Sequence, residues 1–373
     1  MARREVIVVG ISGGVDSAVA ALQLTRAGFD VQGLHMTNWE DGDAYCTAAD
    51  DYQAARRVCA ELDIPLHRAN FSVAYREQVF AEFLAGYQAG HTPNPDVLCN
   101  RHIKFGTFLE HARRLGAERI ATGHYARIDA RGPVRLLKAA DPGKDQTYFL
   151  HAVPGEALRQ ALFPLGDLTK RQVRSIAAEA GLPNHQRPDS TGICFIGERP
   201  FREFLGRHLQ QEPGPIVDTQ GRELGRHQGL AFYTLGQRGG LGIGGLSGGA
   251  AAPWYVAAKR PADRSLVVVQ GRGHPLLWST EMTTGPASWI DAVPPGIASP
   301  AGWRCHVRLR HRHEPGAATI SSASDGSLRV RFERPQWAIT PGQYAVFYDG
   351  DACLGGAVIM SAHSVSAAQS SVA

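Results

Sequence analysis

Residues 5–17 read EVIVVGISGGVDS, and this stretch decides the fold. The apolar, β-branched run over residues 5–11 predicts a buried strand, and residues 17–27 have the pattern of a helix. Between them, Ser12 and two glycines predict a tight turn. A strand that passes through a glycine-rich turn into a helix presents backbone N–H groups at the positive end of the helix dipole. The pattern therefore predicts a site for phosphate.

The same alternation of strand and helix continues over the first 125 residues. We expect strands at residues 31–36, 66–71 and 119–124, and helices at residues 48–62, 73–89 and 100–115. Gly28 and Gly116 follow two of these helices, where C-terminal caps are common. A repeated βαβ pattern predicts an α/β fold, in which helices cover both faces of a parallel sheet.

The remainder of the chain predicts smaller units. Residues 134–153 resemble a hairpin that turns at residues 141–143, and residues 170–180 a last helix before Gly181. The first domain is thus predicted at residues 1–204, and the Gly- and Pro-rich stretch after it predicts a central linking domain at residues 205–284. A C-terminal antiparallel β-barrel is predicted at residues 285–363, before a flexible tail at residues 364–373. Its expected strands are residues 303–310, 318–322, 327–332 and 343–348.

Composition excludes several classes of protein. The chain has 373 residues, of which 43% are hydrophobic and 20% charged, and it contains no apolar stretch near the ~18 residues of a membrane span. Its six cysteines are too few for a disulfide scaffold, and none forms a CxxC pair. We find no secretion signal and expect a soluble, cytoplasmic monomer with no membrane partner.

Charge is distributed unevenly along the chain. The net charge is +4, but the first 100 residues are acidic and the remainder is basic, with all but five of the 39 basic residues being arginine. Arginine suits bidentate phosphate contacts, so a nucleic acid becomes a candidate partner. From charge alone, a solvated basic surface is the simpler interpretation.

The turn after the first strand has specific chemistry. The hydroxyls of Ser12 and Ser17 can add hydrogen bonds to a phosphate, whereas Asp16 suits such a site only with Mg²⁺ between it and the phosphates. Residues 10–14 also satisfy the GxSxG pattern of hydrolases. We reject that reading because the nine preceding residues cannot supply the earlier strands and oxyanion loop that a hydrolase needs.

Two cysteines lie in polar turns. Residues 94–100 read NPDVLCN and are expected to deliver Cys99 to a helix N-terminus, where the dipole and the nearby Arg101 and Lys104 would favour the thiolate. Asp96 is a candidate general acid or base. Cys194 ends a similar turn at residues 189–195. Either cysteine alone is more simply a buried, inert residue, as we expect for Cys46, Cys59, Cys305 and Cys353. We expect no resident metal at His311 and His313, which lack a third ligand nearby.

These motifs together resemble those of the bacterial tRNA-specific 2-thiouridylases. The resemblance covers nearly the whole chain, and its paired cysteine motifs are more specific than the phosphate loop alone. Besides Met36 and the segment after it, the matching stretches are residues 10–17, 92–100, 121–127, 144–150, 189–199, 201–207, 234–245 and 340–343.

The resemblance implies a fold, a reaction and site residues. The first domain would be a Rossmann-like ATP-pyrophosphatase domain with a PP-loop, and ATP would adenylate the C2 oxygen of the wobble uridine. Cys194 would carry sulfur as a persulfide supplied by a relay protein, and Cys99 would be its partner. Either the persulfide or hydrosulfide released from it would then attack C2. The implied ATP-binding residues are Gly10, Ile11, Ser12, Gly13, Gly14, Val15, Asp16, Ser17, Met36 and Gly123. The implied tRNA contacts are Asn94, Pro95, Asp96, Lys144, Asp145, Gln146, Arg310 and His311.

Two other functions remain as alternatives. An amide-forming or ammonia-using ligase would need the ATP loop but neither cysteine, and an RNA-binding protein would use ATP only to gate binding. The last domain favours RNA, because alternation along a strand would place four arginines on one face for phosphate contacts. These are Arg304, Arg308, Arg310 and Arg312.

Overall fold

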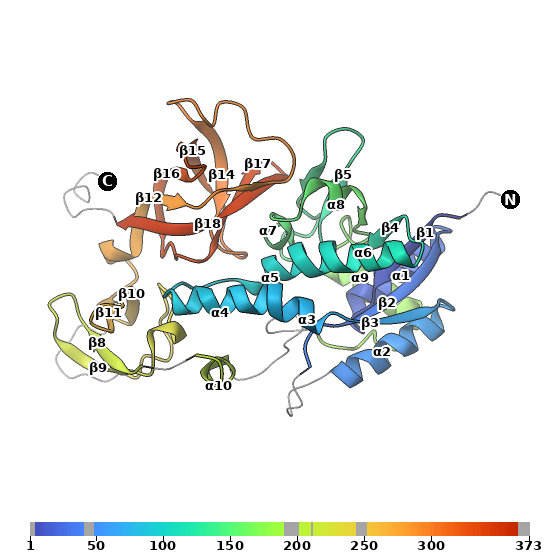
Figure 1. The fold of residues 1–373 in the computed structure, drawn as a ribbon, viewed down its shortest axis with the longest axis horizontal. Helices are drawn as coiled ribbons and strands as arrows, with labels where there is room; N and C mark the ends of the chain where they lie inside the picture. The colour runs from blue at the N-terminus through green and yellow to red at the C-terminus, as the bar shows by residue number, and fades with distance from the viewer. Residues whose placement is uncertain (1–3, 41–47, 190–200, 210–211, 244–251, 365–373) are drawn as a thin grey trace.

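The computed structural model describes residues 4–40, 48–189, 201–209, 212–243 and 252–364. Figure 1 shows three parts. The α/β domain lies on the right of the view, the small β domain at the lower left, and the antiparallel barrel above the small β domain. The predicted class of fold is confirmed.

The α/β domain is built on a five-stranded parallel sheet in the order β3-β2-β1-β4-β7. Its strands are β1 (Val6–Gly10), β2 (Asp30–Thr37), β3 (Leu66–Asn70), β4 (Arg119–Ala121) and β7 (Ala161–Leu162). Alternate residues of β1 point to opposite faces of this sheet, as strand geometry requires. Ile7 and Val9 share a buried cluster with α1 and α2, whereas Val6 and Val8 share another with Phe108 of α6. Helices therefore cover both faces.

The helices begin and end close to their predicted limits. Gly28, Gly116 and Gly181, which follow three of them, adopt positive φ, as expected of C-terminal caps. The predicted helices at residues 73–89 and 100–115 each contain a π-helical stretch, η1 or η2. The described helices are α1 (Val15–Arg26), α2 (Ala48–Glu61), α3 (Ser72–Tyr75), η1 (Arg76–Phe80), α4 (Ala81–Gln88), α5 (Pro95–Leu98), η2 (Cys99–Thr107), α6 (Phe108–Arg114), α7 (Thr147–Leu150), α8 (Gly155–Arg159), α9 (Lys170–Glu179) and α10 (Phe201–Gly206).

The predicted hairpin at residues 134–153 is wrong. The hairpin lies earlier, between β5 (Arg127–Asp129) and β6 (Arg135–Leu137), and residues 147–150 form α7. The physical reason is tertiary packing. The ring of Tyr148 is fully buried, and its hydroxyl donates to the carbonyls of Leu309 and Tyr344 in the barrel. These contacts override the β propensity of the sequence TYFL.

The central domain contains a four-stranded sheet in the order β10-β11-β8-β9. Its strands are β8 (Gly214–Val217), β9 (Glu223–His227), β10 (Trp254–Arg260) and β11 (Ser265–Gln270). Two short 3₁₀ helices, η3 (Leu230–Phe232) and η4 (Pro275–Leu277), follow β9 and β11 respectively.

The last domain is a closed antiparallel barrel, because β12 pairs with both β16 and β18. The order around it is β12-β16-β15-β14-β17-β18. Its strands are β12 (Trp278–Thr284), β14 (Trp303–Arg308), β15 (Gly316–Ser322), β16 (Leu328–Trp337), β17 (Tyr344–Asp349) and β18 (Ala352–Ser364), and β13 (Ser288–Trp289) pairs with β18. Strand β6 of the first domain also pairs with β18, so the two domains share a sheet.

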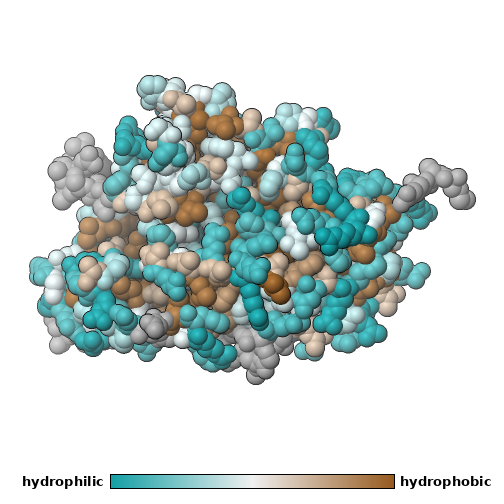
Figure 2. Space-filling model, viewed as in Figure 1, coloured by the Kyte–Doolittle hydropathy of each residue, from teal (hydrophilic) through white to brown (hydrophobic). Residues whose placement is uncertain are grey.

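The surface drawn in Figure 2 intersperses apolar residues with polar ones. Within the described part of the chain, no helix combines the length and apolar character needed to cross a bilayer.

Candidate functional site

The phosphate-binding loop lies where the strand order of the parallel sheet reverses. Strand β1 lies between β2 and β4 in the sheet. Where the strand order reverses in this way, a crevice beyond the carboxyl ends of the strands commonly binds ligands. Gly123, just after β4, faces the loop so closely that a Cβ there would lie 2.8 Å from the backbone nitrogen of Ser17. Met36 of β2 approaches Gly10 from the other side. The structure thus places the predicted Met36 beside Gly10 and the predicted Gly123 beside Asp16 and Ser17.

The loop conformation depends on one glycine and two hydroxyls. Gly13 has a φ of +86°, and a Cβ there would lie 2.6 Å from the carbonyl oxygen of Asp51. Ser17 Oγ accepts from the backbone N–H of Ser12 at 3.2 Å and donates to the carbonyl of Gly14 at 3.0 Å. Gly14 then caps the 12-residue α1 without a side-chain partner. Hydrogen bonds within the loop therefore support its shape, with the positive end of α1 beside it.

Asp16, in the first turn of α1, is held by two side chains that the sequence analysis did not assign. The hydroxyl of Tyr125 donates to its Oδ1 at 2.8 Å, and the ammonium of Lys170 lies 2.7 and 2.9 Å from its two oxygens. Tyr125 is almost fully buried. Burial is the main cause that raises the pKa of the Tyr125 hydroxyl, and the charge of Asp16 raises it further. Tyr125 lies in the matching stretch at residues 121–127 and could have been selected from it. For Lys170, the sequence indicates only the start of a helix and gives no sign of a functional role.

Asp189 is the second carboxylate of the site. Lys170 Nζ reaches it at 2.7 Å, and Lys144 and Arg174 each donate to it at the same distance. Burial opposes ionisation of Asp189, but the hydrogen bonds from Lys144 and Lys170 hold its pKa at about 2. Lys170 therefore bridges two carboxylates, one in the loop and one immediately before residues 190–200.

The predicted tRNA contacts at residues 144–146 all have intramolecular partners. Lys144 binds Asp189, and Gln146 accepts the backbone N–H of Tyr125 at 2.9 Å. Asp145 is buried and accepts from the guanidinium of Arg308 in the barrel at 2.9 Å. This segment therefore joins the ATP loop to the last domain, and its contact with tRNA stays a prediction.

Cys99 lies one turn inside its helix rather than at the N-terminus, so the expected placement is wrong. Pro95 is the first residue of α5, and the side chain of Asn94 caps it by accepting the N–H of Asp96 at 3.1 Å. Cys99 is fully buried and begins the π-helical η2, a rare conformation that is frequent at functional sites. Arg101 reaches away to the hydroxyl of Ser288 at 3.1 Å.

The structure describes three of the other five cysteines. Cys59, Cys305 and Cys353 are buried, as expected, and burial raises the pKa of their thiols to about 11, 12 and 12. Cys46 and Cys194 lie outside the described residues.

Arg310 and His311 lie at the junction of the barrel with the other domains. Arg310 Nη2 donates to the carbonyls of Leu235 and Ala338 and to the hydroxyl of Thr340, at 2.9 to 3.1 Å. His311 Nε2 lies 2.8 Å from the carbonyl oxygen of Asp145. Both residues thus have structural partners, and their contact with tRNA remains a prediction.

The predicted cluster of four guanidinium groups is wrong. Strand β14 ends at Arg308, so its alternation does not extend to Arg310 and Arg312. Arg308 turns inward to Asp145, whereas Arg304 is 85% exposed and lies 3.8 Å from Glu333.

The donor set at Asp16 fits magnesium only together with nucleotide. The described residues contain no group of three or more His, Cys, Asp or Glu side chains that could hold a metal. Mg²⁺ commonly binds through one or two carboxylates and the substrate phosphates, and Asp16 can supply one carboxylate.

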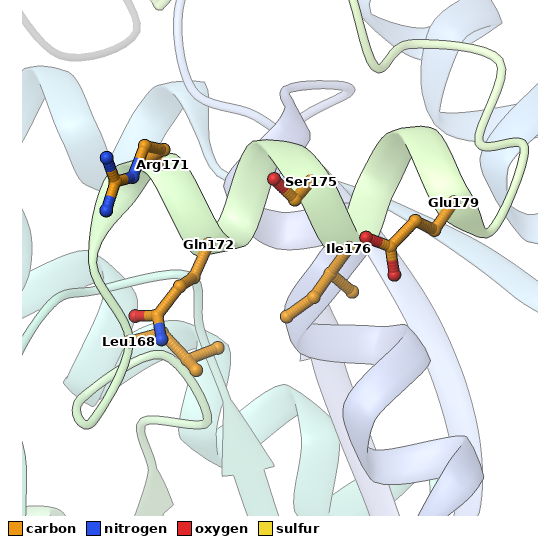
Figure 3. Close-up of a pocket in the computed structure, with 6 residues that line it drawn as sticks. All are labelled: Leu168, Arg171, Gln172, Ser175, Ile176 and Glu179. Carbon is orange, nitrogen blue, oxygen red and sulfur yellow. The ribbon is translucent and has the colours of Figure 1, made fainter.

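A groove of about 330 Å³ on the outer side of α9 lies apart from these groups (Figure 3). It is lined by Leu168, Arg171, Gln172, Ser175, Ile176 and Glu179. None of these residues belongs to the loop, the Asp16 cluster or the cysteine motif.

The fold and the loop define a nucleotide-binding α/β domain of the ATP-pyrophosphatase class. The family model described as "tRNA methyl transferase HUP domain" matches residues 5–198. The models described as "tRNA methyl transferase PRC-barrel domain" and "Aminomethyltransferase beta-barrel domain" match residues 202–270 and 279–359.

Curated relatives match along almost their whole length. The tRNA-specific 2-thiouridylase MnmA of Acidovorax ebreus is 53% identical over 365 residues, which cover 95% of this chain and 97% of the relative. That of Verminephrobacter eiseniae is 54% identical with the same coverage, and that of Alcanivorax borkumensis is 52% identical over 95% of this chain and 96% of its own. This chain belongs to the tRNA-specific 2-thiouridylase family. Among solved structures, an NMN synthetase from Francisella tularensis is 18% identical, with a TM-score of 0.33 over 54% of this chain and 73% of that one, which supports no conclusion about function.

Proposed function

We propose that this protein catalyses the ATP-dependent 2-thiolation of the wobble uridine of tRNA in the cytoplasm. The observation that carries the proposal is the loop at residues 12–17, at the switch point of a chain that is more than half identical to 2-thiouridylases over nearly its full length. The domains would be residues 1–204 for catalysis, 205–284 for linkage and 285–363 for tRNA binding, and the enzyme would act as a monomer.

The loop favours ATP chemistry over the methyl transfer that the names of two of the matching family models suggest. Backbone N–H groups at the positive end of α1 attract anions such as a triphosphate. Met36 lies beside Gly10, and Gly123 lies beside Asp16 and Ser17, so the adenosine moiety would extend from the loop toward these residues.

The first step activates a poor leaving group. The C2 oxygen of the uridine attacks the α-phosphate of ATP, which forms an O–P bond and releases pyrophosphate toward the loop. Magnesium, when bound with ATP at Asp16, would neutralise charge on the phosphates. Asn94, Pro95 and Asp96 would hold the extruded target base, and Asp96 would accept or supply the proton of this step.

The second step transfers sulfur. A protein carrying a persulfide loads Cys194, whose terminal sulfur attacks C2 and expels AMP, leaving a disulfide between Cys194 and the base. The Cys99 thiolate attacks the Cys194 sulfur, which forms a Cys99–Cys194 disulfide and releases the sulfur on C2 as the thiocarbonyl. A cellular dithiol then reduces the disulfide. Release of hydrosulfide before attack on C2 would use the same residues.

The burial of Cys99 sets a structural requirement on this reaction. Its thiol has no exposed surface in the described conformation, so a group that covers it must move, or take part in the exchange, when Cys99 reacts. The π-helical turns from Cys99 to Thr107 provide a segment whose hydrogen bonds can rearrange to a regular helix.

The direct test compares tRNA nucleosides, by mass spectrometry, from cells with and without this gene. We expect 2-thiouridine derivatives at the wobble position to disappear with the gene and to return with a plasmid copy. Unchanged 2-thiouridine would refute the proposal. A purified protein that releases no pyrophosphate when given ATP and tRNA would instead favour an RNA-binding protein that uses ATP only to gate binding.

A further inference from the structure

The loop carboxylate proposed to meet magnesium is already paired with a cation. Lys170 Nζ lies 2.7 Å from Oδ1 and 2.9 Å from Oδ2 of Asp16, while Tyr125 donates to Oδ1. Any metal that binds this carboxylate must therefore meet the positive charge of Lys170 at close range.

Lys170 is fixed in place independently of Asp16. Its side chain is only 14% exposed, and its backbone N–H donates to Asp141 Oδ2 at 2.9 Å. It is the first residue of α9, whose start is secured by a capping box between Thr169 and Gln172. The backbone of Lys170 is therefore held in place without any contribution from Asp16.

A second carboxylate lies within reach of the same ammonium. Lys170 Nζ is also 2.7 Å from Asp189 Oδ1. If Lys170 gives up its contacts with Asp16, its ammonium keeps its contact with Asp189, so only a small shift is needed. Such a cation can exchange partners without becoming buried and unpaired.

We propose that Lys170 is a placeholder cation, which occupies Asp16 until ATP arrives and so makes metal binding conditional on nucleotide. The inference rests on the proposed function, because it takes Mg·ATP as the ligand of the loop. Free Mg²⁺ meets a single carboxylate that Lys170 has already neutralised. With ATP, the phosphates supply negative charge that attracts the metal to Asp16 and leaves Lys170 with Asp189.

The chain offers a matched control for Lys170. Lys144 Nζ donates to Asp189 Oδ2 at 2.7 Å, so its removal takes a cation from the same cluster but leaves the contact between Lys170 and Asp16. The variants Lys170→Met and Lys144→Met therefore differ in which carboxylate they expose.

The experiment is calorimetric titration of the full chain with magnesium chloride alone, without nucleotide. We expect Lys170→Met to bind Mg²⁺ at least tenfold more tightly than the parent or Lys144→Met. The gain should vanish in the double variant Asp16→Asn/Lys170→Met, because the exposed carboxylate is then absent. Lys170→Gln, which keeps a donor for Asp189, gives the same comparison if Lys170→Met fails to fold.

Two results would overturn the inference. One is an affinity for Mg²⁺ in Lys170→Met and Lys170→Gln that stays within threefold of the parent value. The other is a gain that persists in the double variant, which would place the metal on Asp189. A parallel titration of the parent with Mg·ATP separates the two proposals: absence of binding there would count against the proposed function, whatever magnesium alone does.

Discussion

The buried ion pair between Asp145 and Arg308 predicts a large loss of stability when the arginine is removed. The side chains are 3% and 12% exposed, and the guanidinium lies 2.9 Å from Asp145 Oδ2. Breaking such a pair leaves a buried charge without its partner, which costs about 3–5 kcal/mol. Asp145 keeps hydrogen bonds from the Thr147 hydroxyl and the backbone N–H of Ala139, so we expect Arg308→Met to lose ~3 kcal/mol, at the low end of that range.

The assay is urea unfolding at pH 7, with Arg304→Met as the control. Arg304 is on the same strand, but it is 85% exposed and 3.8 Å from Glu333, so its loss should cost only ~0.5 kcal/mol. The double variant Asp145→Asn/Arg308→Met should recover part of the stability, because no charge is then left buried. Equal midpoints for Arg308→Met and Arg304→Met would refute the reasoning.

Three further predictions concern other parts of the molecule. Burial lowers the pKa of Lys259 to about 8 from 10.5, so the unfolded chain holds a proton in this interval that the folded chain lacks. Between about pH 8 and pH 10.5, the free energy of unfolding of the parent should therefore rise relative to that of Lys259→Met. If the urea midpoints of the two proteins change equally with pH, this prediction is wrong. Gly123→Ala should weaken ATP binding at least tenfold in calorimetry, because its Cβ would lie 2.8 Å from Ser17 N; parental affinity would show that the contact relaxes. Arg310→Ala should weaken tRNA binding and reduce the slope of log K against log salt by roughly 0.7–0.9; an unchanged slope with lower stability would leave Arg310 a structural role only.

The periodic elements of the fold could be predicted from sequence because their causes are local. The β-branched run of β1 and the glycines after α1, α6 and α9 fix strand and helix limits without reference to the rest of the chain. The helix at residues 147–150 could not be predicted in this way, since the burial of Tyr148 against the barrel decides it. The position of Cys99 could have been predicted from the sequence. Asn94 and Pro95 are a typical N-cap and first helical residue, so the helix begins four residues before Cys99.

The candidate site was predictable as a set of motifs but not as a set of contacts. Met36 and Gly123 each lie against a part of the loop region, because parallel strands bring their carboxyl ends to one edge of the sheet; their role in binding stays a prediction. The contact of Lys170 with Asp16 spans 154 positions, and no local pattern indicates it. The alternation that predicted an exposed arginine face fails for the same reason, since Asp145, 163 positions away, draws Arg308 inward.

The central claim is that Cys194 carries the sulfur and Cys99 completes its transfer. The most direct measurement is a single turnover of purified protein with tRNA, ATP and a sulfane-sulfur donor, without reductant, followed by mass spectrometry of the nucleosides and of a non-reducing digest. The parent should yield 2-thiouridine and a Cys99–Cys194 linked peptide pair. Cys194→Ser should release pyrophosphate without thiolated product. Cys99→Ser should load sulfur on Cys194 without turnover, and the sulfur should remain there as the persulfide or as its disulfide with the base. Thiolated tRNA formed at the parental rate by either serine variant would contradict the paired-cysteine mechanism.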